Sequence, residues 1–251
     1  MKIKALLGII VLSLLCGTAF AQDPAKGNIR LFQSFFEDAH VTPEPYIDGE
    51  FDYSYYDNAL EADYYTFAMR AGLPLNPQTE LHFRLGVATL DPDGASSETS
   101  ITDFYLGGRH LLIDGETKVS AGGYVTIPVG KEEAWQDNFD AGVYTALRHP
   151  LDRGIVLTGT IGLMYTEKYD FITNNGHEAT LRIGGGAIYE YSDDVHFVCE
   201  AVMESRHDYM LLTGGIDYAI DRKSSLRAAV GVGVDTAAPD MRAMLSYFYM
   251  F

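Results

Sequence analysis

Charged side chains recur at matching positions along many segments of this chain. The segments alternate between apolar and polar residues, and the side chains of an extended strand point alternately to its two faces. The charges of each segment therefore gather on one face. The set comprises the arginines Arg70, Arg84, Arg109, Arg182, Arg227 and Arg242, the carboxylates Glu50, Asp52, Glu80, Glu190, Glu200, Glu204 and Asp217, and the tyrosines Tyr105, Tyr124 and Tyr144.

Arginines and carboxylates that face one common space can do two kinds of chemistry. They can form ion pairs that brace the walls of the space or fill it. They can also select passing solutes by charge and by hydrogen bonding. The two interpretations do not exclude each other, and the sequence favours neither.

The other candidates for chemistry are ordinary loop residues. Hydrolysis by a His with an acidic residue and a Ser or water nucleophile requires these groups to meet in one site. Such residues occur in two predicted loops, as Glu204, Ser205, His207 and Asp208 and as Asn174, Asn175, His177 and Glu178. Neither group has the local spacing of the barrel phospholipases or proteases, so we expect no catalytic residues.

Two further motifs predict backbone geometry rather than a binding site. Asp91-Pro92-Asp93-Gly94 begins like a calcium loop but lacks the later ligands, and its composition predicts a turn. Gly184-Gly185-Gly186 lies inside an alternating segment, where glycines allow close packing or a kink. We therefore expect no metal and no cofactor.

The charged residues lie on predicted β-strands, because apolar and polar residues alternate from about residue 46 to the C-terminus and such alternation indicates strands. We expect about twelve of them, near 46–56, 64–75, 79–90, 101–113, 117–129, 138–149, 154–166, 178–191, 195–205, 208–220, 224–234 and 241–251. The connections after odd-numbered strands are mostly long and polar, and those after even-numbered strands are mostly tight turns. This layout is typical of a single antiparallel, up-and-down transmembrane β-barrel in an outer membrane.

The bilayer decides which face of each strand points outward. An Arg or Lys on the lipid face costs about 2–4 kcal/mol at the bilayer midplane, so the charged faces must point into the lumen. In the segment 224–234, Leu226, Val230 and Val232 then face lipid, whereas Arg227 faces the lumen. The same alternation places Cys199 against lipid, as a small hydrophobe rather than a reactive thiol.

Both ends of the chain favour export to an outer membrane. Tyr247, Tyr249 and Phe251 occupy alternate positions of the last strand, and a terminal Phe resembles the signal that the barrel-assembly machinery reads. Residues 1–21 combine a basic start, an apolar run and Ala19-Phe20-Ala21, and we interpret them as a cleaved signal peptide. A membrane-anchor helix and a lipid anchor at Cys16 are weaker alternatives, because the apolar run is short and lacks the usual lipobox.

Composition narrows the classes of function. The 251 residues carry a formal net charge of −17, which argues against nucleic acid as a partner because nucleic acid needs a basic surface. The 17 tyrosines, 13 phenylalanines and 25 glycines suit a barrel with aromatic girdles. Without Cys16 the chain keeps a single cysteine, so no intramolecular disulfide is expected. The acidic loops could bridge through divalent ions to lipopolysaccharide, although a solvated rim is the simpler interpretation.

Residues 22–45 do not share the alternation. Ile29, Phe32, Phe35 and Phe36 recur at a spacing of three to four residues, which predicts a short amphipathic helix ended by Pro43. This segment could enter the barrel or cap its periplasmic mouth as a plug. The alternative is a loosely ordered periplasmic tail.

Residues 103–112 and 118–130 form the central hairpin of the expected barrel. Their sequences are DFYLGGRHLL and KVSAGGYVTIPVG, and the second ends in Pro128-Val129-Gly130 before a predicted outer loop. The hairpin resembles that of transporter-type outer-membrane barrels, including the family named for the MetA pathway of phenol degradation. The resemblance implies a barrel that passes small molecules, some of them apolar, and it implies no catalytic residues.

The sequence thus predicts an all-β protein of three parts. These are a signal peptide (1–21), an N-terminal helical or extended segment (22–45) and an outer-membrane barrel (46–251) in a Gram-negative bacterium. We expect a narrow pore or transporter for small solutes that contacts membrane lipid, lipopolysaccharide and the assembly machinery. The alternatives are a non-conducting structural or adhesive barrel and, third, an outer-membrane hydrolase.

Overall fold

The computed structural model describes residues 28–57, 61–168, 176–205 and 208–251. Within these ranges the chain forms thirteen β-strands and one short 3-10 helix, η2 (Glu132–Ala134). The strands are β1 (Tyr46–Tyr56), β2 (Ala62–Asn76), β3 (Thr79–Pro92), β4 (Glu98–Ile101), β5 (Phe104–Asp114), β6 (Lys118–Ile127), β7 (Ala141–Leu151), β8 (Ile155–Lys168), β9 (Gly176–Glu190), β10 (Val195–Glu204), β11 (Tyr209–Ala219), β12 (Ser224–Gly233) and β13 (Met241–Met250). No helix in the described residues is long and apolar enough to cross a membrane.

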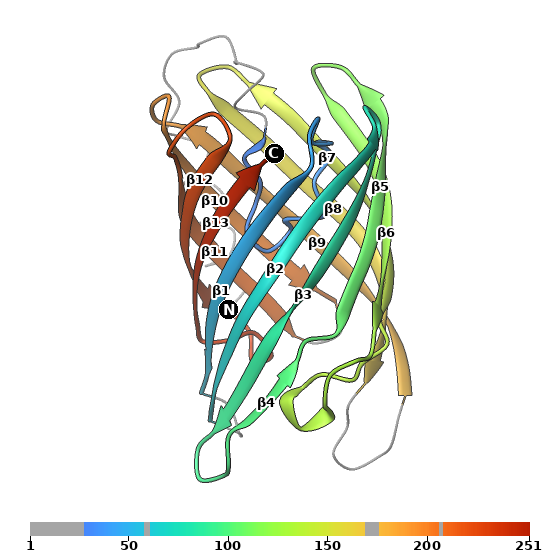
Figure 1. Ribbon diagram of the computed structural model, residues 1–251, viewed down its shortest axis with the longest axis vertical. Helices are drawn as coiled ribbons and strands as arrows, with labels where there is room; N and C mark the ends of the chain where they lie inside the picture. Colours follow the sequence, from blue (N-terminus) through green and yellow to red (C-terminus); the bar gives the residue numbers. More distant parts are fainter. Residues whose placement is uncertain (1–27, 58–60, 169–175, 206–207) are drawn as a thin grey trace.

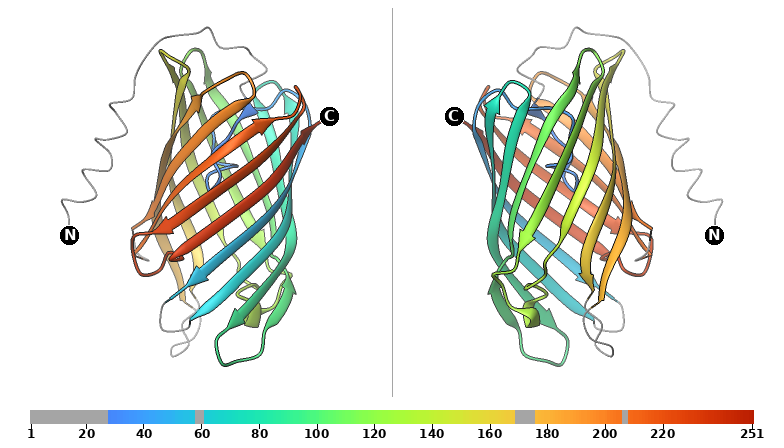
Figure 2. Two further views of the ribbon diagram at one scale, coloured as in Figure 1. Left: turned by 90° about the vertical axis from the view of Figure 1, so that its left-hand side faces the viewer. Right: turned by 90° about the vertical axis from the view of Figure 1, so that its right-hand side faces the viewer.

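The strands form one closed antiparallel barrel, tilted strongly against its axis (Figures 1 and 2). Sequence neighbours pair with each other, and β1 closes the ring by pairing with β13 from Tyr46 opposite Met250 to Tyr55 opposite Met241. Among the described residues, closure pairs every strand of the ring on both sides except the short β4, which pairs only with β3. A membrane-spanning sheet requires such closure. Since β4 and β5 both pair with β3, they act as one interrupted strand, and the predicted twelve-stranded barrel is confirmed.

The interruption between β4 and β5 is a local feature that the alternation did not predict. Leu90 to Val87 pair with Glu98 to Ile101, whereas Arg84 to Thr79 pair with Tyr105 to His110. The two registers differ by one residue, so a β-bulge lies at Thr102 and Asp103.

Alternating exposure confirms the predicted facing of the strands. On β12, Leu226, Val230 and Val232 are 45%, 63% and 58% exposed, whereas Arg227 is 2% exposed. On β13 the aromatic residue Tyr247 faces outward, and Met244, Ser246 and Phe248 are buried. The last strand therefore carries an apolar outer face, but its inner face is less polar than the sequence pattern suggests.

Short turns and long connections lie at opposite rims. In Figure 1 the turns after β2, β5, β7, β9 and β11 lie at the upper rim, where β13 ends beside the start of β1. The backbone N–H of Phe251 donates to the carbonyl of Pro45 at this rim over 2.9 Å. Outer-membrane barrels keep their short turns in the periplasm, so the upper rim is the periplasmic one.

The N-terminal segment contains no α-helix within its described residues 28–45. It folds through turns and bends and lies inside the barrel (Figure 2). The predicted helix is wrong because the barrel wall supplies the hydrogen-bond partners that a helix would find within itself. The backbone N–H groups of Phe32, Gln33 and Ser34 donate to the carboxylate of Glu200, and the carbonyls of Phe36 and Asp38 accept from Arg109.

Candidate functional site

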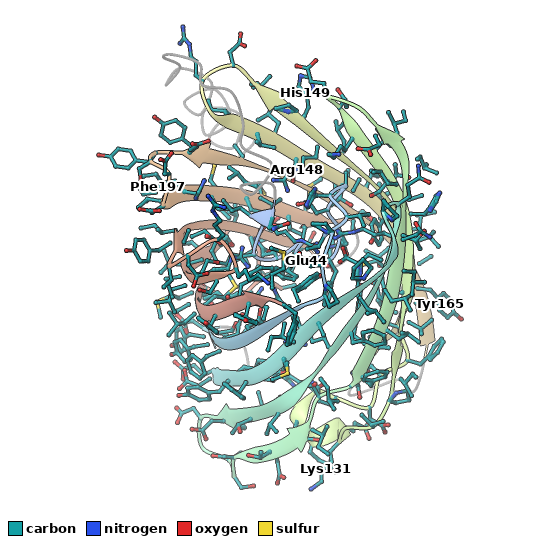
Figure 3. The ribbon with its side chains drawn as sticks, turned by 45° about the horizontal axis from the view of Figure 1, so that its top comes forward. Glu44, Lys131, Arg148, His149, Tyr165 and Phe197 are labelled. Carbon is teal, nitrogen blue, oxygen red and sulfur yellow. The ribbon has the colours of Figure 1, made fainter. Side chains whose placement is uncertain are left out.

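Residues 28–42 fill the middle of the lumen, and we call them the stopper. Leu31, Phe32 and Phe35 are at most 3% exposed. Both ends of the stopper lie at the periplasmic rim, since Asn28 reaches Met250 at one end and Thr42 precedes Pro43 and β1 at the other. Figure 3 looks into the barrel from above this rim, with Arg148 directed inward and Phe197 and Tyr165 outside. The stopper is therefore a loop inserted into the barrel from the periplasmic side.

Glu80 on β3 is the centre of the contacts between wall and stopper. Its carboxylate is fully buried and lies 3.2 Å from Arg30 Nη2 of the stopper and 3.0 Å from Arg109 Nη2 of β5. The Tyr46 hydroxyl donates to it over 2.8 Å, and the backbone N–H of Thr42 donates over 2.7 Å. A dry carboxylate is stable only when it is paired and hydrogen-bonded. Arg109 and Tyr46 of the wall supply one ion pair and one hydrogen bond, and the stopper adds a second of each through Arg30 and Thr42.

Asp38 binds the far side of the stopper to β7. Its carboxylate accepts a hydrogen bond from Arg148 over 2.8 Å, and Arg148 also donates to the carbonyl of Ile29 over 2.9 Å. Burial alone raises the pKa of the Asp38 carboxyl, but the neighbouring guanidinium groups, that of Arg148 foremost, lower this pKa below its ordinary value. Asp38 therefore remains charged inside the barrel.

Glu200 on β10 holds the tip of the stopper. Its two oxygens accept the backbone N–H groups of Phe32, Gln33 and Ser34 over 3.1, 2.8 and 2.7 Å. The Gln33 side chain donates to Thr213 on β11 over 2.7 Å. Glu200 is 4% exposed, so it lies within the packed contact rather than on the wall of a wet pore.

Arginines and aromatic rings add further contacts between the stopper and the barrel wall, and we call all of these contacts together the seal. The Arg227 guanidinium lies 4.3 Å from the centre of the Phe32 ring, and that of Arg70 lies 4.7 Å from the Phe35 ring. Such cation–π contacts gain strength when they are desolvated. Phe36 stacks between His82 and Tyr105 at ring separations of 4.8 and 5.0 Å.

Glycines in the wall make room for the stopper. A Cβ atom on Gly186 would lie 2.9 Å from Leu31, and one on Gly215 would lie 2.5 Å from Phe32. A Cβ atom on Gly184 would lie 3.0 Å from Ser34 Oγ. The interpretation of Gly184-Gly185-Gly186 as close-packing glycines is therefore confirmed at its first and third positions.

The lumen side of the barrel gathers nearly all of the predicted site residues. Contacts with the stopper come from Arg70, Glu80, Tyr105, Arg109, Tyr144, Arg182, Glu200 and Arg227. Arg84 and Arg242 pair instead with Glu50 and Asp52 on β1, and Tyr124 stacks on Tyr105. Glu190 and Glu204 occupy inward positions at the opposite ends of β9 and β10.

The sequence did not single out several residues of the seal. Arg30 and Asp38 lie in a segment without alternation, so no pattern marked their charges as inward. Arg148 could have been found, because it follows the inward Tyr144 by four residues of one strand. An apolar part of the lumen was also missed. It joins Ile29, Leu31 and Phe32 of the stopper to Val156, Ile188, Val198, Ala229 and Met244 of the wall.

Catalytic and metal chemistry gains no support from the described residues. They contain no group of three or more His, Cys, Asp or Glu side chains that could hold a metal ion. Among the loop residues considered for hydrolysis, His207, Asn174 and Asn175 lie outside the described residues.

Together, a closed antiparallel barrel, an apolar outer belt and a charged lumen define an outer-membrane β-barrel. Residues 17–251 match the family model described as "Putative MetA-pathway of phenol degradation". The chain belongs to this family, and the resemblance of its central hairpin is confirmed. None of the curated proteins matches the sequence.

Solved structures with the same fold include outer-membrane channels of low sequence identity. A crystal structure of an outer membrane channel from Pseudomonas putida F1 has a TM-score of 0.67 and 11% identity, covering 92% of this chain and all of that one. The NanC porin has a TM-score of 0.58 and 8% identity, with 82% and 98% covered. The CymD monoaromatic hydrocarbon channel has a TM-score of 0.51 and 10% identity, with 94% and 95% covered.

Proposed function

We propose that this protein is a narrow outer-membrane channel for small solutes, seen here with its lumen closed by the stopper. The observation that carries the proposal is the nature of the seal. The stopper is held by ion pairs and hydrogen bonds to β3, β5, β7 and β10. No disulfide cross-links it to the wall, since residues 28–42 contain no cysteine and Cys199 is free. A loop held in this way can leave and return.

The solutes of solved channels with this fold support a small-molecule substrate. One such channel is named for monoaromatic hydrocarbons, and the Pseudomonas putida TodX is named as a toluene transporter. The lumen of this chain offers both charged pairs, such as Arg242 with Asp52, and stacked rings, such as Tyr105 with Tyr124. It therefore suits small solutes that combine a polar group with an apolar surface. We propose no catalytic role for any residue.

A non-conducting structural barrel is the second candidate, and the completeness of the seal favours it. Glu80, Asp38 and Glu200 all have partners across the interface between stopper and wall. In a barrel that never opens, these contacts between stopper and wall would serve only to stabilise the barrel. The two candidates differ in one measurable property, which is whether the stopper moves.

Tethering the stopper to β9 tests this difference. Ser34 Oγ lies 3.0 Å from the position that a Cβ atom on Gly184 would occupy. In a disulfide, the Cβ atom of one cysteine lies about 3 Å from the sulfur of the other, so two cysteines at these positions can be bonded. Thr160 Cγ2 lies 2.8 Å from the same place, so Thr160→Ser should accompany Ser34→Cys and Gly184→Cys in a Cys199→Ala background. In planar bilayers we expect no conductance from the oxidised protein and openings after reduction.

The matched control omits Gly184→Cys and should conduct equally under both conditions. Mass spectrometry would confirm that the disulfide forms. Conductance by the fully oxidised protein would show that solutes do not pass where the stopper lies. A wild-type protein without conductance at any salt concentration, and unchanged by removal of the stopper, would establish the structural barrel instead.

For the route to the membrane, we propose a cleaved signal peptide at residues 1–21 and recognition of β13 by the barrel-assembly machinery. Tyr247 of β13 and Phe251, which directly follows this strand, support the proposal, since they are 45% and 56% exposed. We also propose that the extracellular loops face lipopolysaccharide and that the barrel wall contacts membrane lipid.

Deletion of Phe251 should lower the amount of folded, heat-modifiable barrel in outer-membrane fractions, because the assembly signal ends at this residue. Gel mobility before and after heating measures the folded fraction. Leu151→Ala is a suitable control, since Leu151 is also exposed, at 42%, and ends a different strand. Equal folding and localisation of the deletion variant and the control would refute the proposed signal.

A further inference from the structure

The bulge at Asp103 holds the extracellular connection between β6 and β7. The Asp103 carboxylate accepts four backbone N–H groups, two from each flank of that connection. They belong to Val129, Gly130, Asp137 and Asn138, over 3.1, 3.2, 3.0 and 2.9 Å. One side chain therefore fixes both ends of the loop 129–138, and it can do so because the bulge takes Asp103 out of the strand ladder.

The loop carries Trp135, the only tryptophan in the sequence. Its backbone is left-handed, with φ of 56°, and the backbone of Asp137 is left-handed as well, with φ of 78°. Bulky residues rarely adopt this conformation, and they keep it where the surrounding structure enforces it. In this loop the enforcement comes from Asp103 and from Gln136, whose side chain accepts from the Asp103 N–H over 2.8 Å and donates to the Tyr64 hydroxyl over 2.8 Å.

The Trp135 ring lies against inward residues of strands on the opposite side of β3. It stacks on Tyr64 of β2 at a ring separation of 5.7 Å and meets Tyr56 of β1 edge-on at 5.4 Å. Both tyrosines occupy lumen positions near the extracellular ends of their strands. All three side chains are partly exposed. The loop thus carries an indole ring into the outer mouth of the barrel, on the extracellular side of the stopper.

We propose that Trp135, Tyr64 and Tyr56 form the entry site of the channel, where small aromatic solutes stack before they reach the stopper. Asp103 is the positioning residue of this site, because it sets the loop that presents Trp135. The assignment deepens the proposed function by locating its first binding step, and its role in transport rests on that function.

The main surface that the entry site offers is that of its three ring faces. Three of the polar groups nearby are engaged: the Tyr64 hydroxyl accepts from Gln136, Asp103 binds the loop backbone, and Asp52 binds Arg242. A sugar needs several unengaged hydrogen-bonding groups around its ring, whereas an aromatic solute needs stacking or edge contacts at separations like those seen here. The site therefore favours an aromatic ring over a saturated ring of similar size.

Trp135 allows binding to be measured without any transport, because its fluorescence reports on this site alone. We expect benzyl alcohol to change the emission of the detergent-solubilised protein in a saturable way. Cyclohexylmethanol and methyl glucoside serve as saturated-ring and sugar probes and should bind at least several-fold more weakly. Tyr64→Leu should weaken benzyl alcohol binding by about three- to tenfold, as expected for loss of one aromatic contact. Tyr191→Leu, which alters a 67% exposed ring in a periplasmic turn, should leave binding unchanged.

Asp103→Asn separates positioning from contact. It should shift the Trp135 emission to longer wavelength and increase quenching by iodide, because the loop loses the carboxylate that fixes it, and it should weaken benzyl alcohol binding. Trp135→Leu, measured by calorimetry, should weaken binding at least as much as Tyr64→Leu. Equal binding of the three probes, or wild-type affinity in both the Tyr64 and the Trp135 variants, would overturn the assignment. If the protein binds aromatic probes but never conducts, the proposed channel function is wrong, whereas the assignment of the aromatic binding site remains valid.

Discussion

Glu80→Gln is expected to open the channel and to lower the stability of the closed state more than any other single substitution. The substitution keeps the shape of the side chain but leaves Arg30 and Arg109, both buried, without their shared carboxylate. Removing one partner of a buried ion pair costs about 3–5 kcal/mol. In the open state the same arginines meet water, so most of that cost falls on the closed state.

A cost of about 3 kcal/mol corresponds to a shift of roughly 100-fold in the ratio of open to closed protein. Single-channel recording of the open probability measures this ratio directly. Glu132→Gln is the matched control, since it removes the same charge from η2 in an extracellular loop, away from the stopper. An open probability equal to that of the control would show that Glu80 does not hold the stopper.

Deleting residues 28–42 is expected to give the second large effect, a channel that stays open. The barrel should still close, because β1 pairs with both β13 and β2 without any contribution from the stopper. Conductance should rise to a steady level without the long closures of the full-length protein. Unfolding by heat should occur at a lower temperature, since the apolar wall around Val156, Ile188 and Val198 loses its cover.

The full-length protein purified in parallel is the reference for this deletion. Heat-modifiable mobility on gels separates a folded, open barrel from a misfolded one. A deleted protein that folds but does not conduct would mean that wall residues close the lumen by themselves, and the structural-barrel interpretation would then hold.

The barrel and the facing of its strands were predictable because both follow from a local period of two. Leu226 and Arg227 are adjacent in sequence and must face opposite sides, whatever the rest of the chain does. The cost of a charged side chain in lipid then determines which side faces the membrane and which faces the lumen. This is why inward charges as distant as Arg70 and Arg242 could be placed on one lumen from sequence alone.

The stopper was not predictable in the same way, because its contacts join residues far apart in the chain. Phe32 and Glu200 are 168 positions apart, and no local pattern relates them. The spacing of Phe32, Phe35 and Phe36 is helical, but the partners of their backbone groups come from the wall, and this overrides the local preference. The bulge at Asp103 was missed for a related reason, since its partners lie more than twenty residues away.

The path of the stopper has a consequence for the order in which the protein folds. Because the stopper enters and leaves the lumen at one rim, no part of the chain has to be threaded through a closed ring. The seam between β1 and β13 begins at Tyr46, directly after the chain leaves the lumen at Pro45. The cylinder can therefore be completed first, and the loop can be tucked in as the final step of maturation. A barrel completed in this order would be open until the loop enters. Cells that make a variant whose loop cannot enter should therefore leak small molecules through the outer membrane from the moment of assembly.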